Sequence, residues 1–250
     1  MYILVAAGYT AAVFVVLYLT VPLFWKEKAR AACIVQGGYR GNVILFAIPI
    51  VESVCGPDLV GIVSVCASVV VPIYNILAVI LFETMRGEKV KTVALLRNLF
   101  RNPLITGAIA GITAAWLDST TGWTLPDFVM EPVSELSAMN TPLSLILLGA
   151  GLRFGSIRKD LRDISFVCLI KLVIVPAGIA AICHALGIRG AAFFSLFSIF
   201  CVPTAVSSYP MAEQMGGDGT FAAETVAVSS LFSLVTVFLW IAGLKTIGLI

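Results

Sequence analysis

Long apolar stretches alternate with short polar connections along the whole chain. Eight of them approach or exceed the ~17 residues that a helix needs to cross about 30 Å of hydrocarbon. They lie at residues 1–25, 41–57, 59–83, 103–117, 133–152, 164–186, 190–212 and 222–249. The pattern therefore predicts an all-α membrane protein with eight transmembrane helices.

The composition supports this interpretation. Hydrophobic residues make up 60% of the 250 residues, charged residues only 12%, and the mean hydropathy is +1.04. A soluble domain usually carries about 25% charged residues, so a water-soluble fold is excluded. Residues 1–20 contain no Lys or Arg and no small-residue cleavage site, so we expect a true span there and not a removable signal peptide.

Positive charges gather in three connections, each separated from the next by two spans. Twelve of the sixteen cations lie there, namely Lys26, Lys28, Arg30, Arg86, Lys89, Lys91, Arg97, Arg101, Arg153, Arg158, Lys159 and Arg162. The opposite connections hold Asp58, Asp118 and Asp127, with only Arg189 against them. Because cytoplasmic loops are enriched in Lys and Arg, we expect a multi-pass protein of the cell membrane with both termini extracytoplasmic.

Groups that could support catalysis or bind a metal are few. The six cysteines stand singly without a CxxC pair, and His184 is the one histidine. The sequence has no HExxH motif, no GxSxG elbow and no paired intramembrane aspartates. We therefore expect no enzyme, no metal, no cofactor and no nucleic-acid partner.

A basic segment at residues 86–102 divides the chain into a first repeat of three spans, 1–85, and a second repeat of five spans, 103–250. Its apolar residues fall near helical spacing, which favours an amphipathic helix on the cytoplasmic membrane surface, bound to anionic lipid. A solvated linker is the alternative.

Two stretches from the different halves match each other in order. The stretch from Asn42, NVILFAIPIVESVCGPD, can be laid on the stretch from Pro203, PTAVSSYPMAEQMGGD. The two stretches run in opposite directions in the predicted topology, which indicates an inverted repeat. In transporters built this way, helices interrupted by Gly or Pro break near the midplane of the membrane and cross there.

We expect the two breaks at residues 37–41 and 202–204. The expected break and crossover residues are Gly38, Gly41, Pro49 and Pro210. Asn42 and Thr204 are placed to cap the half-helices that follow. Each half-helix would then present free N–H groups and a partial positive charge, which suit a carboxylate.

Several polar residues near the breaks are candidates for binding. Arg40 is placed either to pair with a substrate carboxylate or to snorkel to the inner surface. Lys171 lies well inside its span, where an ammonium is expensive unless it is paired, snorkels, or neutralises an anion or replaces a coupling cation. Glu52 and Glu213 are candidates for proton or ion handling, or for solvating helix ends. Asn75 is expected to hydrogen-bond between helices.

Four segments resemble the auxin efflux carrier family, which includes plant auxin exporters and bacterial malate- and dicarboxylate-type permeases. They are RGNVILFAIPIVESVCG (40–56), RNPLITGAIAGI (101–112), NTPLSLILLGAGL (140–152) and PTAVSSYPMAEQMGGD (203–218) with VAVSSLFSLVTVFLW (226–240). The resemblance implies a fold similar to sodium/proton antiporters, with a mobile crossover domain beside a scaffold domain. It also implies that Asn42 matches the crossover asparagine of the family and Pro203 its second crossover proline.

The family usually has ten spans, and this chain matches it from the third span onward. A truncated gene model and a genuine short form both account for this, and either affects the contacts of a candidate homodimer.

The sequence thus predicts a secondary active transporter of small organic anions, mono- or dicarboxylates similar to auxin or malate, with a proton or sodium ion as candidate coupling ion. The candidate substrate-binding residues are Arg40, Asn42, Pro203, Thr204, Ser207 and Lys171. The alternative is a membrane channel or a sensor module without coupled transport.

Overall fold

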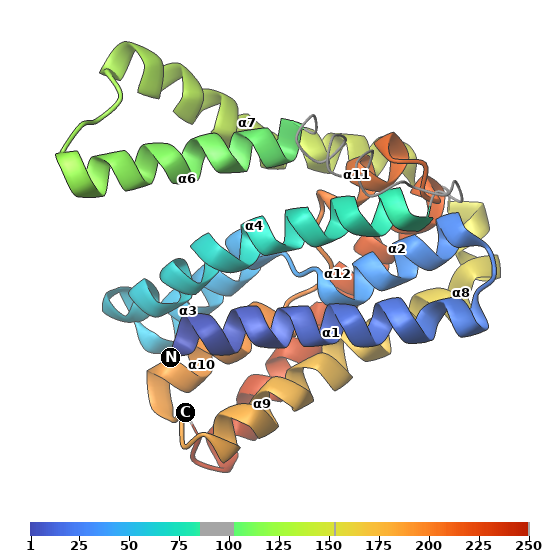
Figure 1. Cartoon of the computed structure of the whole chain (residues 1–250). Coiled ribbons are helices and arrows are strands. Elements are labelled where there is room, and N and C mark those ends of the chain that lie inside the picture. Colours follow the sequence, from blue (N-terminus) through green and yellow to red (C-terminus); the bar gives the residue numbers. More distant parts are fainter. Residues whose placement is uncertain (86–102, 153, 250) are drawn as a thin grey trace.

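Helices make up nearly all of the computed structural model, which describes residues 1–85, 103–152 and 154–249 (Figure 1). In chain order the elements are α1 (Tyr2–Phe24), α2 (Lys28–Tyr39), the π-turn η1 (Val43–Ala47), α3 (Ile48–Cys55), the 3-10 turn η2 (Pro57–Leu59), α4 (Val60–Met85), α6 (Pro103–Thr121), α7 (Asp127–Gly151), α8 (Phe154–Leu169), the π-turn η3 (Ile170–Ile174), α9 (Val175–Ala185), α10 (Gly190–Cys201), α11 (Ser208–Gln214) and α12 (Gly219–Thr246). The all-α prediction is confirmed. The amphipathic segment predicted at 86–102 lies outside the described residues.

Four helical segments are long and apolar enough to cross a membrane. They are Tyr2–Phe24, Pro57–Met85, Ile157–Ala185 and Gly219–Thr246, and Val43–Cys55 and Gly190–Cys201 are shorter apolar helices. The membrane-protein prediction is confirmed. The count of eight spans stays a prediction, which requires α6 and α7 to cross as well.

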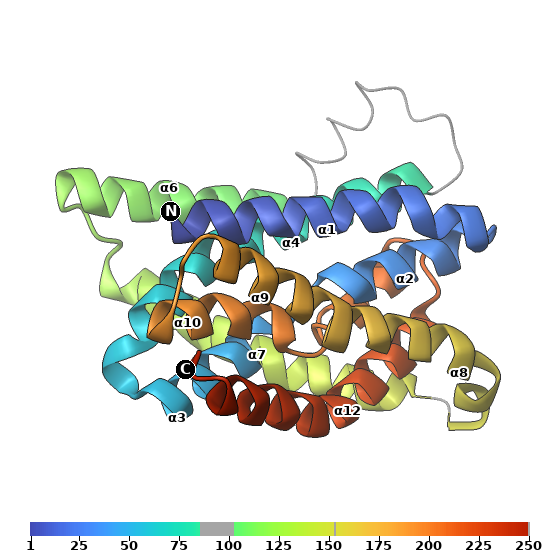
Figure 2. The same cartoon turned by 90° about the horizontal axis from the view of Figure 1, so that it is seen from below.

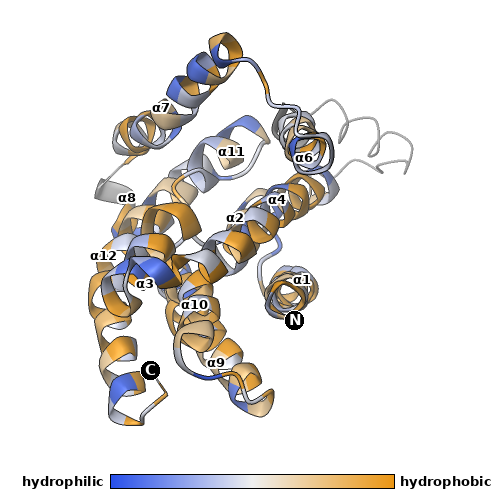
Figure 3. Cartoon of the chain, turned by 90° about the vertical axis from the view of Figure 1, so that its left-hand side faces the viewer, coloured by the Kyte–Doolittle hydropathy of each residue, from blue (hydrophilic) through white to orange (hydrophobic). Residues whose placement is uncertain are grey.

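Large apolar side chains cover the outside of the bundle. On α1, Leu4 is 77% exposed and Leu23 65% exposed, and on α12 Leu234 and Phe238 are similarly open. Figure 3 shows hydrophobic residues over the outer sides of both helices. In water such a surface would drive aggregation, whereas in a bilayer it contacts lipid chains at no cost.

Helix α10 forms the centre of the core. Every residue from Phe193 to Cys201 is buried, and the helix packs against α4, α9, α3 and both π-turns. Phe193 stacks on Phe197, whose ring also meets Trp240 of α12 edge-on. This rigid core supports the point at which α10 ends.

The two interrupted helices run in opposite directions. In Figure 1, α2 and α3 lead toward the end of the bundle where both termini lie, whereas α10 and α11 lead away from it. The same end carries both termini in the view of Figure 2. Opposite directions are what an inverted repeat predicts, and both the repeat and the side of the membrane on which the termini lie stay predictions.

An ion cluster ties three helices together at the opposite end. The Arg30 guanidinium of α2 contacts Asp160 at 2.5 Å and Asp163 at 3.1 Å, both on α8, and Asp218 at 2.9 Å. It also lies 4.0 Å from the centre of the Phe221 ring. Asp218 in addition caps α12 by accepting a hydrogen bond from the Phe221 amide. Helix α2 is therefore anchored to the second half of the chain.

Each of the two π-turns ends two residues before a proline. Ala47 ends η1 and Pro49 follows, while Ile174 ends η3 and Pro176 follows. A proline within a helix has no N–H, and its ring clashes with the carbonyl four residues earlier, so the preceding turn widens. Pro49, predicted as a break residue, therefore widens a helix that continues through it.

The carbonyl of Leu172 has no donor at the usual helical position, because residue 176 is a proline and has no N–H. A side chain from another helix supplies a donor instead. The indole N–H of Trp240, on α12, donates to this carbonyl at 2.9 Å.

We expect Trp240→Phe to lower the stability of the purified protein by ~1–3 kcal/mol, because the buried Leu172 carbonyl is left without this donor. Thermal unfolding in detergent measures the change. Trp116→Phe, at an exposed position of α6, is the control, and equal melting temperatures of the two variants would contradict the assignment.

Candidate functional site

The two interrupted helices cross at a single antiparallel β-bridge between Gly41 and Thr204. The Asn42 amide donates to the Pro203 carbonyl at 3.0 Å, and the Ala205 amide donates to the Arg40 carbonyl at 3.3 Å. Extended backbone at both breaks makes these bonds geometrically accessible, since residues 40 and 202 have left the helical region. Segments about 160 residues apart in the sequence thus meet at one point inside the bundle.

The first break begins later than the glycine-rich sequence predicts. α2 continues through Gly38 to Tyr39, and the break covers Arg40 to Asn42. Gly38 serves as a packing position, because a Cβ there would lie 2.7 Å from a methyl group of Leu17 on α1. The prediction of Gly38 as a break residue is therefore wrong, while Gly41 lies within the break.

The predicted caps are also corrected. Asn42 precedes η1, but its side chain makes no capping hydrogen bond. Thr204 lies four residues before α11, and its hydroxyl donates instead to the Gly37 carbonyl of α2 at 2.9 Å. Its amide donates to Ser229 Oγ of α12. Thr204 therefore joins α2, the crossing and α12, so that it acts as a structural clamp.

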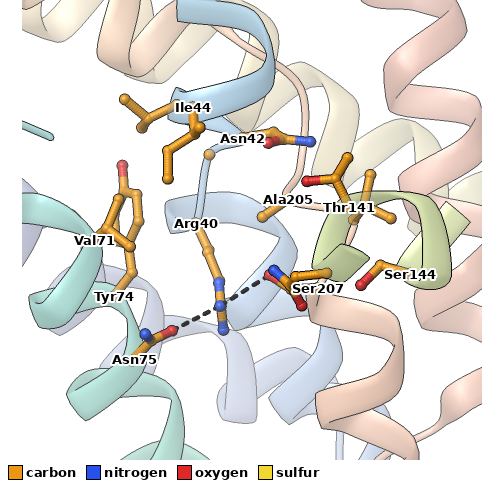
Figure 4. Close-up of a pocket in the computed structure, with 14 residues that line it drawn as sticks. Arg40, Asn42, Ile44, Val71, Tyr74, Asn75, Thr141, Ser144, Ala205 and Ser207 are labelled. Carbon is orange, nitrogen blue, oxygen red and sulfur yellow. Dashed lines mark hydrogen bonds between the residues drawn. The ribbon is translucent and has the colours of Figure 1, made fainter. Parts of the chain in front are cut away.

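A pocket of about 200 Å³ opens beside the crossing. It is formed between the two breaks, α4 and α7 (Figure 4). Its polar lining comprises Arg40, Asn42, Tyr74, Asn75, Asn140, Thr141, Ser144 and Ser207. Three of the six predicted substrate-binding residues, Arg40, Asn42 and Ser207, line this one space. Pro203, Thr204 and Lys171 do not line it.

Arg40 extends from the crossing between α4 and the second break (Figure 4). Its Nη2 donates to Asn75 Oδ1 at 2.8 Å and to Ser207 Oγ at 3.0 Å, and its Nη1 to the Met211 sulfur at 2.9 Å. The residue is only 6% exposed, which excludes snorkelling to the inner surface. In the described part of the chain, the ion pairs involve Arg30 and none involves Arg40. The partners of this buried guanidinium are thus neutral, and its charge has no carboxylate counterpart among the described residues.

Lys171 lies close to Gly41 but does not line this pocket. It is fully buried in η3, which excludes snorkelling, and its ammonium has no hydrogen-bond partner among the described residues. A Cβ on Gly41 would lie 2.9 Å from the Lys171 Nζ, whereas Gly41 itself lines the pocket. Lys171 is therefore a near neighbour of a pocket-lining residue, without lining the pocket itself.

The remaining predicted residues lie apart from the pocket. Glu52 is exposed on α3 and Glu213 on α11. Glu213 packs against Gly219 at the start of α12, where a carboxylate is favoured by the free N–H groups of a helix N-terminus. Pro210 lies within the first turn of α11 and not at the break itself. Their roles in proton or ion handling, or in the crossover, stay predictions.

The pocket residues contributed by α7 were not predicted from the sequence. Asn140, Thr141 and Ser144 of α7 face the crossing, and Figure 4 shows Thr141 and Ser144 opposite Asn42 and Ser207. The signal was present in the polar pair Asn140-Thr141 inside an apolar stretch. Its significance depends on α7 packing against α11 and α12, which no local pattern reveals.

Comparison with known proteins adds a family. The sequence model of a family described as "Membrane transport protein" matches residues 1–241. An uncharacterized transporter of Methanothermobacter thermautotrophicus is 29% identical over 119 residues, which are 47% of this chain. The match covers 39% of that relative's length.

Proposed function

Since the chain belongs to the membrane transport protein family, which is the auxin efflux carrier family, we propose that it is a secondary active transporter of small organic anions. The observation that carries this proposal is the buried Arg40 guanidinium at the wall of a polar pocket, without a carboxylate partner among the described residues. A solute that brings its own carboxylate would supply the missing charge.

The charge and size of the pocket favour a small mono- or dicarboxylate. Arg40 offers a planar donor group, and the amides and hydroxyls of Asn42, Ser207 and Thr141 are placed for further hydrogen bonds. A volume of about 200 Å³ is below the ~300–1,000 Å³ of pockets that hold drug-sized ligands. An acid of the size of malate therefore suits the pocket better than a ring-bearing acid such as indole-3-acetate.

We further propose alternating access as the mechanism. The crossover domain would consist of α1–α4 and α8–α12, and it would move as a rigid body against α6 and α7. The pocket has walls on both sides of that division, from the breaks and from α7. A bound solute would then contact both bodies and be exposed to each side of the cytoplasmic membrane in turn.

Uptake into proteoliposomes tests the proposal. We expect saturable uptake of labelled malate, with indole-3-acetate as the larger comparison, and imposed proton, sodium and voltage gradients identify the driving ion. Flux that rises linearly with concentration would indicate a channel. Absence of carboxylate flux or binding under all gradients would overturn the proposal.

Asn42→Ala provides the matched test of the site. We expect a KM for malate raised roughly tenfold or more, because a hydrogen bond to a charged group contributes ~1.5–3 kcal/mol. The backbone bond from Asn42 to Pro203 remains possible in the variant, so the crossing should persist. Gln214→Ala removes an exposed amide and serves as control. An unchanged KM in Asn42→Ala would remove Asn42 from the site.

A further inference from the structure

The buried ammonium of Lys171 has no role in the pocket contacts described above. It is completely inaccessible to solvent and lacks a hydrogen-bond partner in the described part of the chain. Burying an unpaired charge in a membrane-spanning segment is costly, and such residues persist where the charge is used. The groups around the ammonium indicate what its charge does.

The ammonium lies at the carbonyl end of α10. One point, the position that a Cβ of Gly41 would occupy, is 2.9 Å from the Lys171 Nζ and 3.1 Å from the Ile199 carbonyl oxygen. Ile199 is in the last turn of α10, whose carbonyls have no donor within the helix. The residue four positions on is Pro203, which has no N–H to offer. The Ile199 oxygen therefore lacks its helical partner, and it carries a partial negative charge.

The C-terminal end of α2 lies in the same region, since α2 packs against η3. α2 ends at Tyr39, two residues before Gly41, so the C-termini of both interrupted helices converge near Lys171. Each helix C-terminus carries about half a negative charge. Without a compensating positive charge, the partial negative charges of these two helix ends would repel an anion at the crossing.

We propose that Lys171 is the fixed counter-charge of the crossing: it offsets the carbonyl ends of α2 and α10 and so sets the affinity of the neighbouring pocket for anions without touching them. The absence of a side chain at Gly41 permits this close approach. Lys171 is accordingly a positioning and specificity-determining residue, and the proposal rests on the function proposed above.

Three substitutions at Lys171 separate charge from packing. Lys171→Met keeps most of the volume and removes the charge, Lys171→Arg keeps the charge, and Lys171→Ala leaves a cavity. A unit charge several ångströms from an anion changes its binding constant by roughly tenfold or more at an effective dielectric constant of ~20. We expect Lys171→Met to bind malate at least tenfold more weakly and Lys171→Arg to keep most of the wild-type affinity.

Chemical rescue gives the decisive result. Ethylammonium should enter the cavity of Lys171→Ala and restore malate uptake and melting temperature, whereas ethanol at the same concentration should restore neither. Lys171→Met, which has no cavity, should not respond. Wild-type malate affinity in Lys171→Met, or equal rescue of Lys171→Ala by ethanol, would overturn the proposal.

The design also separates this proposal from the one on which it rests. If the wild-type protein carries no carboxylate, the proposed function fails on that result alone. The counter-charge is then judged by melting temperature: stabilisation of Lys171→Ala by ethylammonium and not by ethanol retains it, and no such difference overturns it.

Discussion

Replacement of Arg40 by Ala is expected to weaken malate binding by roughly 30-fold or more, the largest effect among the pocket residues. A charged pair that is desolvated in a site loses ~2–5 kcal/mol when one partner is truncated. Arg40→Lys should recover little of this, because an ammonium cannot reproduce the simultaneous contacts of the guanidinium with Asn75 and Ser207. Isothermal titration of the detergent-purified protein measures both affinities.

Arg189→Ala is the matched control for Arg40→Ala. Arg189 is exposed at the start of α10, at the other end of that helix from the crossing, so its removal should leave malate affinity unchanged. Parallel melting curves establish that each variant is folded. A folded Arg40→Ala protein with wild-type affinity would show that the carboxylate binds elsewhere.

The second large effect is expected at Gly41. A methyl group there would lie 2.9 Å from the Lys171 Nζ and 3.1 Å from both the Ile199 carbonyl oxygen and a Val202 methyl group. Gly41 does not have a positive φ, so the conflict is steric and not conformational. Overpacking of this kind costs ~1–3 kcal/mol, and it would be concentrated on the bonds of the crossing. Gly41→Ala should therefore lower the melting temperature and reduce malate uptake at least tenfold.

Gly61→Ala is the comparison for Gly41→Ala. Gly61 lies in α4, where an added methyl group would have no neighbouring atom within 4 Å, so the substitution should be neutral or slightly stabilising through helix propensity. If Gly41→Ala transported malate as well as Gly61→Ala does, close approach of Lys171 to the backbone would not matter for function.

Local patterns predicted the parts of the fold that depend on local chemistry. Apolar runs identified the helices, because a helix in lipid satisfies its own backbone. Proline and glycine indicated the two interruptions, since both residues weaken a helix at the position where they occur. The first break was misplaced by a few residues because Gly38 suits close packing as well as it suits a break.

The functional environment depended on contacts that sequence patterns do not contain. Arg40 and Asn42 were identifiable as candidates because they lie at the first break. Thr204 looked like a helix cap and instead bonds to Gly37, some 170 positions away. The position of Lys171 next to Gly41, and of Thr141 in the same pocket as Asn42, required the packing of η3 and α7 to be known.

Two hydrogen bonds of the crossing join main-chain atoms only: two amides and two carbonyls, with Pro203 supplying the carbonyl that a proline retains. These two bonds do not use the Asn42 side chain, whereas Gly41 and Thr204 are constrained by their own contacts at the crossing. Under the proposed function, exchange of Asn42 would change cargo preference while the two main-chain bonds persist, which would give this architecture a simple route to new transported compounds.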